Sequence, residues 1–210
     1  MPEPHTFALF AAASLAFIAV PGPSVIYIVS RSLAEGRRAG IVSALGIQTG
    51  GLVHVLAATI GVSALLASSA VAFSVVKYAG AAYLIYLGLR KLLAGEAPEE
   101  RAAGPVGRRQ LYWQGVVVNS LNPKTALFFL AFLPQFVDPD GSTRGQLALL
   151  GITFVVIALT TDLIWAVVAG TAGAVLKRSR TFLRIQRYVS GTIFIGLGAL
   201  AAATGRSHGG

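Results

Sequence analysis

Two short proline motifs interrupt long apolar stretches of the sequence, Pro21-Gly22-Pro23 in the first half and Asn122-Pro123-Lys124 in the second. A proline inside a helix removes a backbone donor, and its ring displaces the carbonyl four residues earlier. In hydrocarbon, carbonyls freed in this way have to be satisfied by protein or by a wet cavity. Paired interruptions at matching places in two halves of a chain are typical of a transporter binding site. The freed carbonyls are those of Phe17, Ala19 and Asn119.

Asp162, His54 and Lys124 are ionisable residues inside these apolar stretches. A charge at the centre of a bilayer costs at least about 2.5–3.5 kcal/mol, so such residues are functional hypotheses by default. His54 and Asp162 lie near the middle of their stretches, at roughly equivalent places in the two halves. Two readings of Asp162 stay open: a group that carries protons, or a structural counter-ion of Lys124.

Lys124 and His54 each allow two readings as well. Lys124 directly follows a proline and has Asn119 and Asn122 close by in sequence, which suits a cation lining a polar cavity. A lysine can also snorkel from a helix end to the membrane surface. His54 is either a structural hydrogen-bond donor or part of a proton path. Gln48 adds a neutral polar contact in the same helix as His54.

The composition is that of a membrane protein. Of the 210 residues, 55% are hydrophobic and 12% are charged, and the mean hydropathy is +0.72. A spanning helix needs about 20 apolar residues. The stretch from Ala39 to Val76 is too long for one helix, so we expect a turn near residues 67–69. The expected spans are Thr6–Ser30, Ala39 to that turn, Ala70–Leu89, Gln110–Val137, Gly145–Leu176 and Tyr188–Gly205.

The basic residues predict an orientation. Three alternate connections hold 13 of the 17 lysines and arginines, whereas the opposite side has Lys77, Arg144 and Arg206. Under the positive-inside rule the basic side faces the cytoplasm, so both termini are expected on the outer side of the cell membrane. Attraction to anionic membrane lipids accounts for the net charge of +9 without nucleic-acid binding.

A faint internal repeat divides the chain. Shifting the sequence by 110 residues places Lys77-Tyr78 on Arg187-Tyr188 and Leu87-Gly88 on Leu197-Gly198. An odd number of spans in each half requires opposite insertion of the halves, as in inverted-repeat transporters. We therefore predict an all-α membrane protein of six transmembrane helices in a 3+3 inverted repeat, with the first and fourth helices broken. The predicted divisions are residues 1–94, a cytoplasmic linker at 95–110, and residues 111–210.

Small residues form one stripe on each of two helices, and such stripes favour close helix packing. On the second helix they flank His54, and on the fifth they flank Asp162. The stripes are Gly46, Gly50, Ala58 and Gly61, and Ala158, Ala166, Gly170 and Gly173.

Other classes of protein fit the residues less well. An intramembrane hydrolase needs paired carboxylates, a serine with a positioned base or several zinc ligands, and the expected spans hold one aspartate and one histidine. A divalent-cation exporter is the closer alternative, but one carboxylate beside a lysine is a poor cage for a hard cation. No metal site and no cofactor is expected. The chain contains no cysteine, which excludes disulfides and thiolate chemistry.

These features together resemble the LysE/RhtB family of amino-acid exporters. The resemblance rests on Val20-Pro21-Gly22-Pro23-Ser24, on the glycine-spaced segment from Gly40 to Gly61, and on the segment from Asn119 through Phe129 to Leu133-Pro134-Gln135-Phe136. Members often have Asn or another small polar residue where this chain has Ser24. The resemblance implies efflux of amino acids or close derivatives from the bacterial cytoplasm, driven by protons.

A zwitterionic substrate needs a partner for each of its charges. Amides freed around Pro21-Gly22-Pro23 and the Lys124 ammonium suit the carboxylate, while Asp162 and freed carbonyls suit the ammonium. Asp162 is the first candidate for proton coupling, and His54 is the second. Burial of a carboxyl group favours its protonated form, whereas an approaching cation favours its charged form. The sequence leaves the exported amino acid and any homo-oligomer open. The predicted substrate-binding residues are Pro21, Gly22, Pro23, Ser24, Gln48, Asn119, Asn122, Pro123 and Lys124.

Overall fold

The computed structural model describes residues 3–62, 70–93, 107–138 and 140–176, together with 188, 192, 195, 196 and 199. Within these residues the chain is helical, with short connections and no strand, so the all-α prediction is confirmed there. Three expectations lie largely or wholly outside the described residues: the turn at 67–69, most of the 95–110 linker, and most of the sixth span. The 3+3 repeat therefore stays a prediction.

Both proline motifs break a helix. The first break separates α1 (Pro4–Ala19) from α2 (Pro23–Glu35), and the two helices are bent by 53°. The second separates α6 (Arg108–Ser120) from α7 (Pro123–Leu127), with a bend of 43° between α6 and the segment that starts at Pro123. Pro23 and Pro123 each begin the new helix, where a missing N–H leaves no bond unmade. The predicted interruptions of the first and fourth spans are confirmed.

Longer helices complete the described part of the chain. They are α3 (Arg37–Ala57), α5 (Ala70–Leu93) and α8 (Thr143–Leu176). Short π-helical and 3-10 segments continue α3 and α7, namely η1 (Ala58–Val62), η2 (Phe128–Phe132) and η3 (Leu133–Phe136). Two helices in the described regions are long and apolar enough to cross a membrane, and each bent pair supplies one more candidate span.

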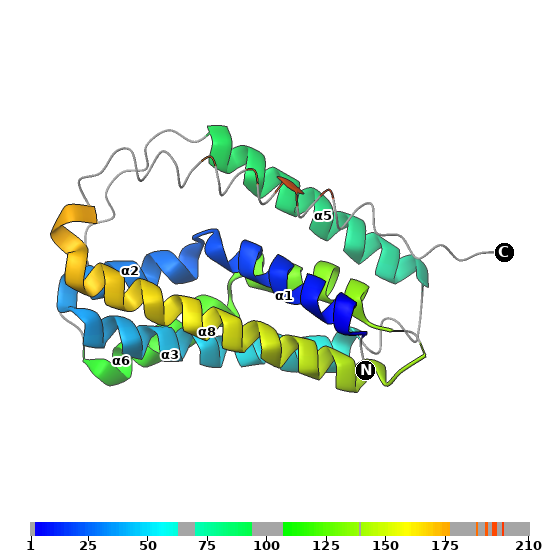
Figure 1. Cartoon of the computed structure of the whole chain (residues 1–210), viewed down its shortest axis with the longest axis horizontal. Coiled ribbons are helices and arrows are strands. Elements are labelled where there is room, and N and C mark those ends of the chain that lie inside the picture. The colour runs from blue at the N-terminus through cyan, green and yellow to red at the C-terminus, as the bar shows by residue number, and fades with distance from the viewer. Residues whose placement is uncertain are drawn as a thin grey trace.

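The long helix α8 lies along the bundle and packs against α1, α2 and α3, while α5 runs along the outside and contacts η2 (Figure 1). Helices α3 and α6 approach closely through their glycines. A Cβ on Gly50 would lie 2.5 Å from the Val116 carbonyl oxygen, and one on Gly115 would lie 2.8 Å from the Ser43 carbonyl oxygen. The predicted packing stripe on α3 is thus confirmed at Gly50, whereas Gly61 has nothing within 4 Å.

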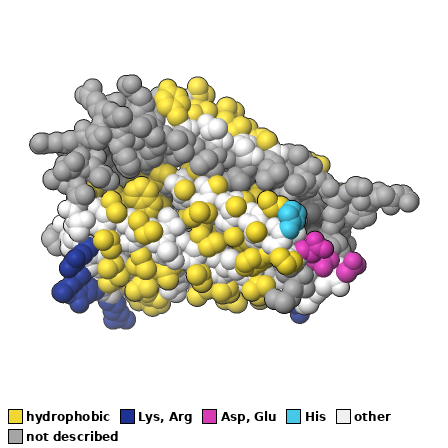
Figure 2. All heavy atoms as spheres, viewed as in Figure 1, with side chains coloured by type: hydrophobic (Ala, Val, Ile, Leu, Met, Phe, Trp, Pro, Cys, Tyr) yellow, Lys and Arg dark blue, Asp and Glu magenta, His cyan; other side chains and the backbone are white. Residues whose placement is uncertain are grey.

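A cluster of phenylalanine rings fills the space between α1, η2 and α8. The centroid of the Phe128 ring lies 4.3 Å from that of Phe17 and 4.8 Å from that of Phe154, and both pairs of rings are tilted by 34°. Apolar side chains also cover much of the outer surface between a basic end and an acidic end (Figure 2). This distribution, with apolar atoms inside and outside, is the one expected of a protein surrounded by lipid.

Candidate functional site

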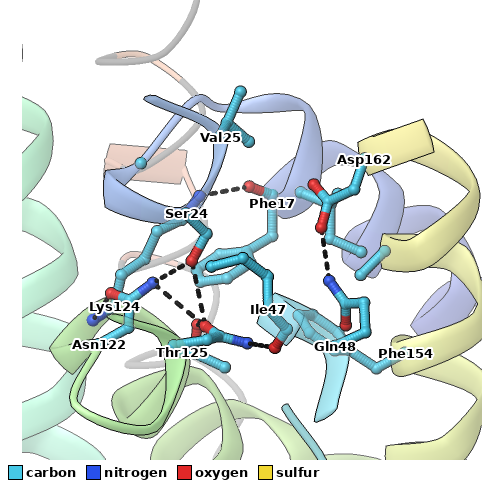
Figure 3. Close-up of a pocket in the computed structure, with 14 residues that line it drawn as sticks. Phe17, Ser24, Val25, Ile47, Gln48, Asn122, Lys124, Thr125, Phe154 and Asp162 are labelled. Atoms are coloured by element: carbon cyan, nitrogen blue, oxygen red, sulfur yellow. Dashed lines mark hydrogen bonds between the residues drawn. The ribbon is translucent and has the colours of Figure 1, made fainter. Parts of the chain in front are cut away.

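The two helix breaks meet around one small cavity of about 40 Å³. Roughly 10–15 Å³ of such space admits one water molecule, so the cavity has room for a few. Its walls come from the first break, from α3, from the second break and from α8 (Figure 3). Seven residues predicted from sequence line it: Gly22, Ser24, Gln48, Asn119, Asn122, Lys124 and Asp162.

The side chain of Asn119 ties these elements together. Its Oδ1 accepts hydrogen bonds from the hydroxyls of Ser24 and Thr125, each at 3.1 Å. Its Nδ2 donates to the Ile47 carbonyl oxygen at 2.8 Å. Asn119 is 4% exposed, and such a buried amide is stable only when its donors and acceptors are paired. One side chain therefore joins α2, α3 and both sides of the second break.

Asn122 shapes the start of α7. Its Oδ1 accepts the backbone N–H of Lys124 at 3.0 Å, which is the geometry of an N-cap, and Pro123 follows as the first helical residue. Its Nδ2 donates to the Ser24 hydroxyl at 3.0 Å. Asn122 therefore ends one helix segment, starts the next and contacts the first break.

Lys124 is buried, and its ammonium group reaches the first break (Figure 3). Nζ donates to the carbonyl oxygens of Phe17 at 3.0 Å and Val20 at 2.6 Å. The Phe17 carbonyl is the one that Pro21 displaces from its helix. Gly22 leaves room for the lysine, because a Cβ there would lie 2.9 Å from Lys124 Cδ. Lys124 thus lies as expected of a cation that lines a polar cavity. Its side chain does not extend to the surface, as the snorkelling alternative requires.

Asp162 lies across the cavity from Lys124 (Figure 3). Its Oδ2 accepts a hydrogen bond from Gln48 Nε2 at 2.6 Å. Within the described residues Asp162 and Lys124 make no direct salt-bridge contact, and both readings of Asp162, as a proton carrier and as a structural counter-ion, stay open. Among the same residues, the other amide atom of Gln48, Oε1, is a buried acceptor without a partner.

His54 lies outside the cavity wall. Its Nε2 is 2.7 Å from the Asn119 carbonyl oxygen, which is the carbonyl that Pro123 displaces. A carbonyl only accepts, so Nε2 carries the proton of this bond. His54 therefore makes the structural hydrogen bond that one of its two readings requires. The other reading, that His54 belongs to a proton path, stays a prediction.

Several lining residues were not predicted as site residues. Thr125 follows Lys124 directly, and its hydroxyl could have been inferred from that position. Ala158 and Phe154 precede Asp162 by four and eight residues, so they share its helix face. Phe17 contributes its ring and its carbonyl, of which only the carbonyl was expected. Conversely, three residues that were predicted to bind substrate, Pro21, Pro23 and Pro123, belong to the breaks but are not among the residues that line the cavity.

In the described part of the chain, no three acidic or histidine side chains are grouped closely enough to hold a metal ion. A cavity between interrupted helices, with a cation on one wall and a carboxylate on the other, is typical of membrane transporters.

Comparison with known proteins gives the family. The chain matches the LysE type translocator family over residues 15–205, and it belongs to that family. It is 32% identical to the homoserine/homoserine lactone efflux protein of Salmonella typhimurium over 184 residues, covering 87% of this chain and 89% of the relative. It is 30% identical to an uncharacterized membrane protein of Vibrio cholerae over 200 residues, covering 94% and 97%. No solved structure matches the chain. The protein is therefore a multi-pass membrane translocator.

Proposed function

We propose that this protein exports amino acids or close derivatives from the bacterial cytoplasm in exchange for protons. The single observation that carries the proposal is the cavity between the two helix breaks, with the Lys124 ammonium on one wall and the Asp162 carboxylate on the other. The names of the efflux relatives from Salmonella support substrates related to homoserine.

The two walls suit the two ends of an amino acid. Lys124 and the backbone N–H groups at the start of α2 form a cationic wall that suits a carboxylate. Asp162 offers an acceptor to an ammonium group, and the carbonyls of the first break add acceptors once Lys124 has left them. The neutral side chains between them, Asn119 and Gln48, add hydrogen bonds without net charge. A zwitterion therefore finds a partner for each charge.

A volume of about 40 Å³ is far below the roughly 300 Å³ of the smallest ligand pockets, so the cavity has to open to admit substrate. Rocking of one half of the bundle against the other opens it to each side in turn. The breaks are the natural place for this motion, because polar side-chain contacts rather than continuous helix join the segments there.

Asp162 is the group to which we assign the proton. It is the one carboxylate among the lining residues, and it is 3% exposed. Binding of a substrate ammonium favours the charged carboxylate, whereas a bound proton removes that charge. Substrate and proton therefore compete for the same group, which is the requirement for exchange.

Proteoliposomes loaded with labelled amino acid test the assignment. Asp162→Asn is expected to abolish efflux driven by a pH gradient and to retain downhill substrate exchange, since exchange needs no net proton release. If Asp162 instead serves as a structural counter-ion, the double variant Asp162→Asn, Lys124→Gln recovers both expression and activity. Uphill transport by the double variant at the parental rate would overturn the mechanism.

Two further measurements test substrate and orientation. A strain expressing the protein is expected to gain resistance to inhibitory amino acids or analogues, homoserine among them, and labelled divalent cations are expected to show no counterflow.

A cysteine at Ser142 is expected to react with an impermeant thiol reagent in intact cells, whereas one at Gly104 reacts only after lysis. Labelling of Gly104→Cys in intact cells would contradict the proposed inner-membrane orientation.

A further inference from the structure

The Lys124 ammonium lies in a cage formed by the first helix break. Two backbone carbonyls accept from Nζ, Phe17 at 3.0 Å and Val20 at 2.6 Å, and Nζ lies 4.4 Å from the centroid of the Phe17 ring. Both carbonyls belong to the C-terminal end of α1, where the helix dipole favours cations. The aromatic face adds a cation–π contact. Hydrogen-bond acceptors, a negative helix end and a ring together match a primary ammonium group.

The cage and its occupant come from different parts of the chain. Phe17 and Val20 stand more than a hundred residues before Lys124, which projects from the start of α7. The side chain of lysine ends in a primary ammonium group, and alkylamines and amino acids carry the same ammonium group. Lys124 is therefore placed like a ligand of the first break.

The cage also opens towards the cavity. Phe17, Gly22 and Lys124 all line it, and Asp162 faces them from α8. The lysine stem passes Gly22, where even a methyl group would press on Cδ at 2.9 Å. A lysine that leaves the cage therefore remains in a cavity that already contains a carboxylate.

We propose that this carbonyl cage is a binding site for a primary ammonium group, that Lys124 fills it from within in the substrate-free protein, and that a substrate ammonium displaces Lys124. The displacement of Lys124 by a substrate rests on the proposed function. The binding of an added amine in the cage does not rest on it. The cage and the proposed function can therefore be refuted separately.

The test is chemical rescue in purified full-length protein. Lys124→Ala is expected to unfold at a lower temperature than the parent, and butylammonium chloride is expected to raise its midpoint by several degrees in a saturable way. Lys124→Met, whose apolar chain fills the path to the cage, is expected not to respond. Tetramethylammonium at equal concentration is expected to have no such effect, because it donates no hydrogen bond. Equal stabilisation by tetramethylammonium, or no effect of butylammonium, would overturn the proposal.

A second variant keeps the lysine in place and covers the case in which Lys124→Ala does not fold. Gly22→Ala pushes on the lysine stem, so butylammonium is expected to stabilise it at a concentration at least about threefold lower than the parent needs, because the tethered competitor is weakened. Gly61→Ala is the matched control, since nothing lies within 4 Å of its added methyl group, and it is expected to respond like the parent. A Gly22→Ala response equal to that of the parent contradicts the cage.

Comparison of binding with transport separates the two proposals. Amine rescue with failed amino-acid efflux would refute the proposed function and leave the cage. Efflux without amine rescue would refute the cage and leave the proposed function.

Discussion

The break between α1 and α2 and the break between α6 and α7 free backbone carbonyls in the same way but satisfy them from different sources. At the first break the Phe17 and Val20 carbonyls accept from Lys124, a cation of the other half of the chain. At the second break the Asn119 carbonyl accepts from His54 and from the backbone N–H of Asn122 at 2.9 Å. The second break thus supplies part of its own hydrogen bonding, whereas the first depends on a long, charged side chain.

The difference suggests a criterion for which break changes its hydrogen-bond partners during transport. Neutral amides and a local N-cap hold the second break, and such contacts favour one fixed geometry. A lysine has several rotatable bonds and a charge that another cation can replace. We infer that the first break changes partners during transport, while the second acts as the scaffold. The following variants test this contrast, in descending order of the effect that we expect on stability or transport.

Lys124→Met is expected to be the most damaging. It removes the charged donor from the Phe17 and Val20 carbonyls, and hydrogen bonds to charged groups contribute about 1.5–3 kcal/mol each. For the two bonds together we expect a loss of about 3–6 kcal/mol in unfolding free energy in detergent, together with loss of efflux. A loss below about 1 kcal/mol would show that the first break does not depend on Lys124.

Asn119→Leu is expected to cost somewhat less, about 1–3 kcal/mol, because it leaves the Ser24 and Thr125 hydroxyls and the Ile47 carbonyl without their shared partner. The same unfolding measurement applies. Thr160→Val is the control, since Thr160 is exposed on α8 and, among the residues that the structure describes, its hydroxyl bonds to the Val156 carbonyl of its own helix. Its expected change is within about 0.5 kcal/mol.

Replacing Pro21 and Pro23 together by alanine is expected to separate stability from transport. The new N–H of residue 21 can bond to the Phe17 carbonyl and so compete with Lys124. We expect unfolding free energy within about 1 kcal/mol of the parent and efflux at least about tenfold slower. Pro4→Ala, at the first position of α1, controls for loss of a proline. Normal transport by the double alanine variant would mean that the first break is not needed for exchange.

His54→Leu is expected to have the smallest effect, about 1 kcal/mol or less, because the Asn122 N–H still reaches the Asn119 carbonyl. Under the structural reading, efflux driven by a pH gradient and downhill exchange fall together and only slightly. Under the proton-path reading, gradient-driven efflux is lost while exchange continues. Measuring both modes in one preparation therefore decides between the readings.

The helix breaks and the candidate charged residues could be predicted from the sequence, because each depends on the type and position of a single residue. Proline removes a specific backbone bond wherever it stands, so Pro21 and Pro123 sufficed to predict both breaks and the freed carbonyls of Phe17 and Asn119. The cost of a charge in hydrocarbon likewise made Asp162 and Lys124 candidates on their residue types and positions. Neither inference needs a partner residue, which is why a single sequence supports both.

The pairing of these groups, in contrast, depends on how the helices pack. Lys124 could have paired with Asp162 on charge alone, but its ammonium bonds to two carbonyls, and Asp162 bonds to Gln48. These pairings depend on how closely α3 approaches α6 at Gly50 and on which side of α8 faces the first break. Both are features of helix packing that a local stretch of sequence does not specify. A buried donor bonds to the nearest acceptor that the packed backbones present, and that geometry exists only once the helices are assembled.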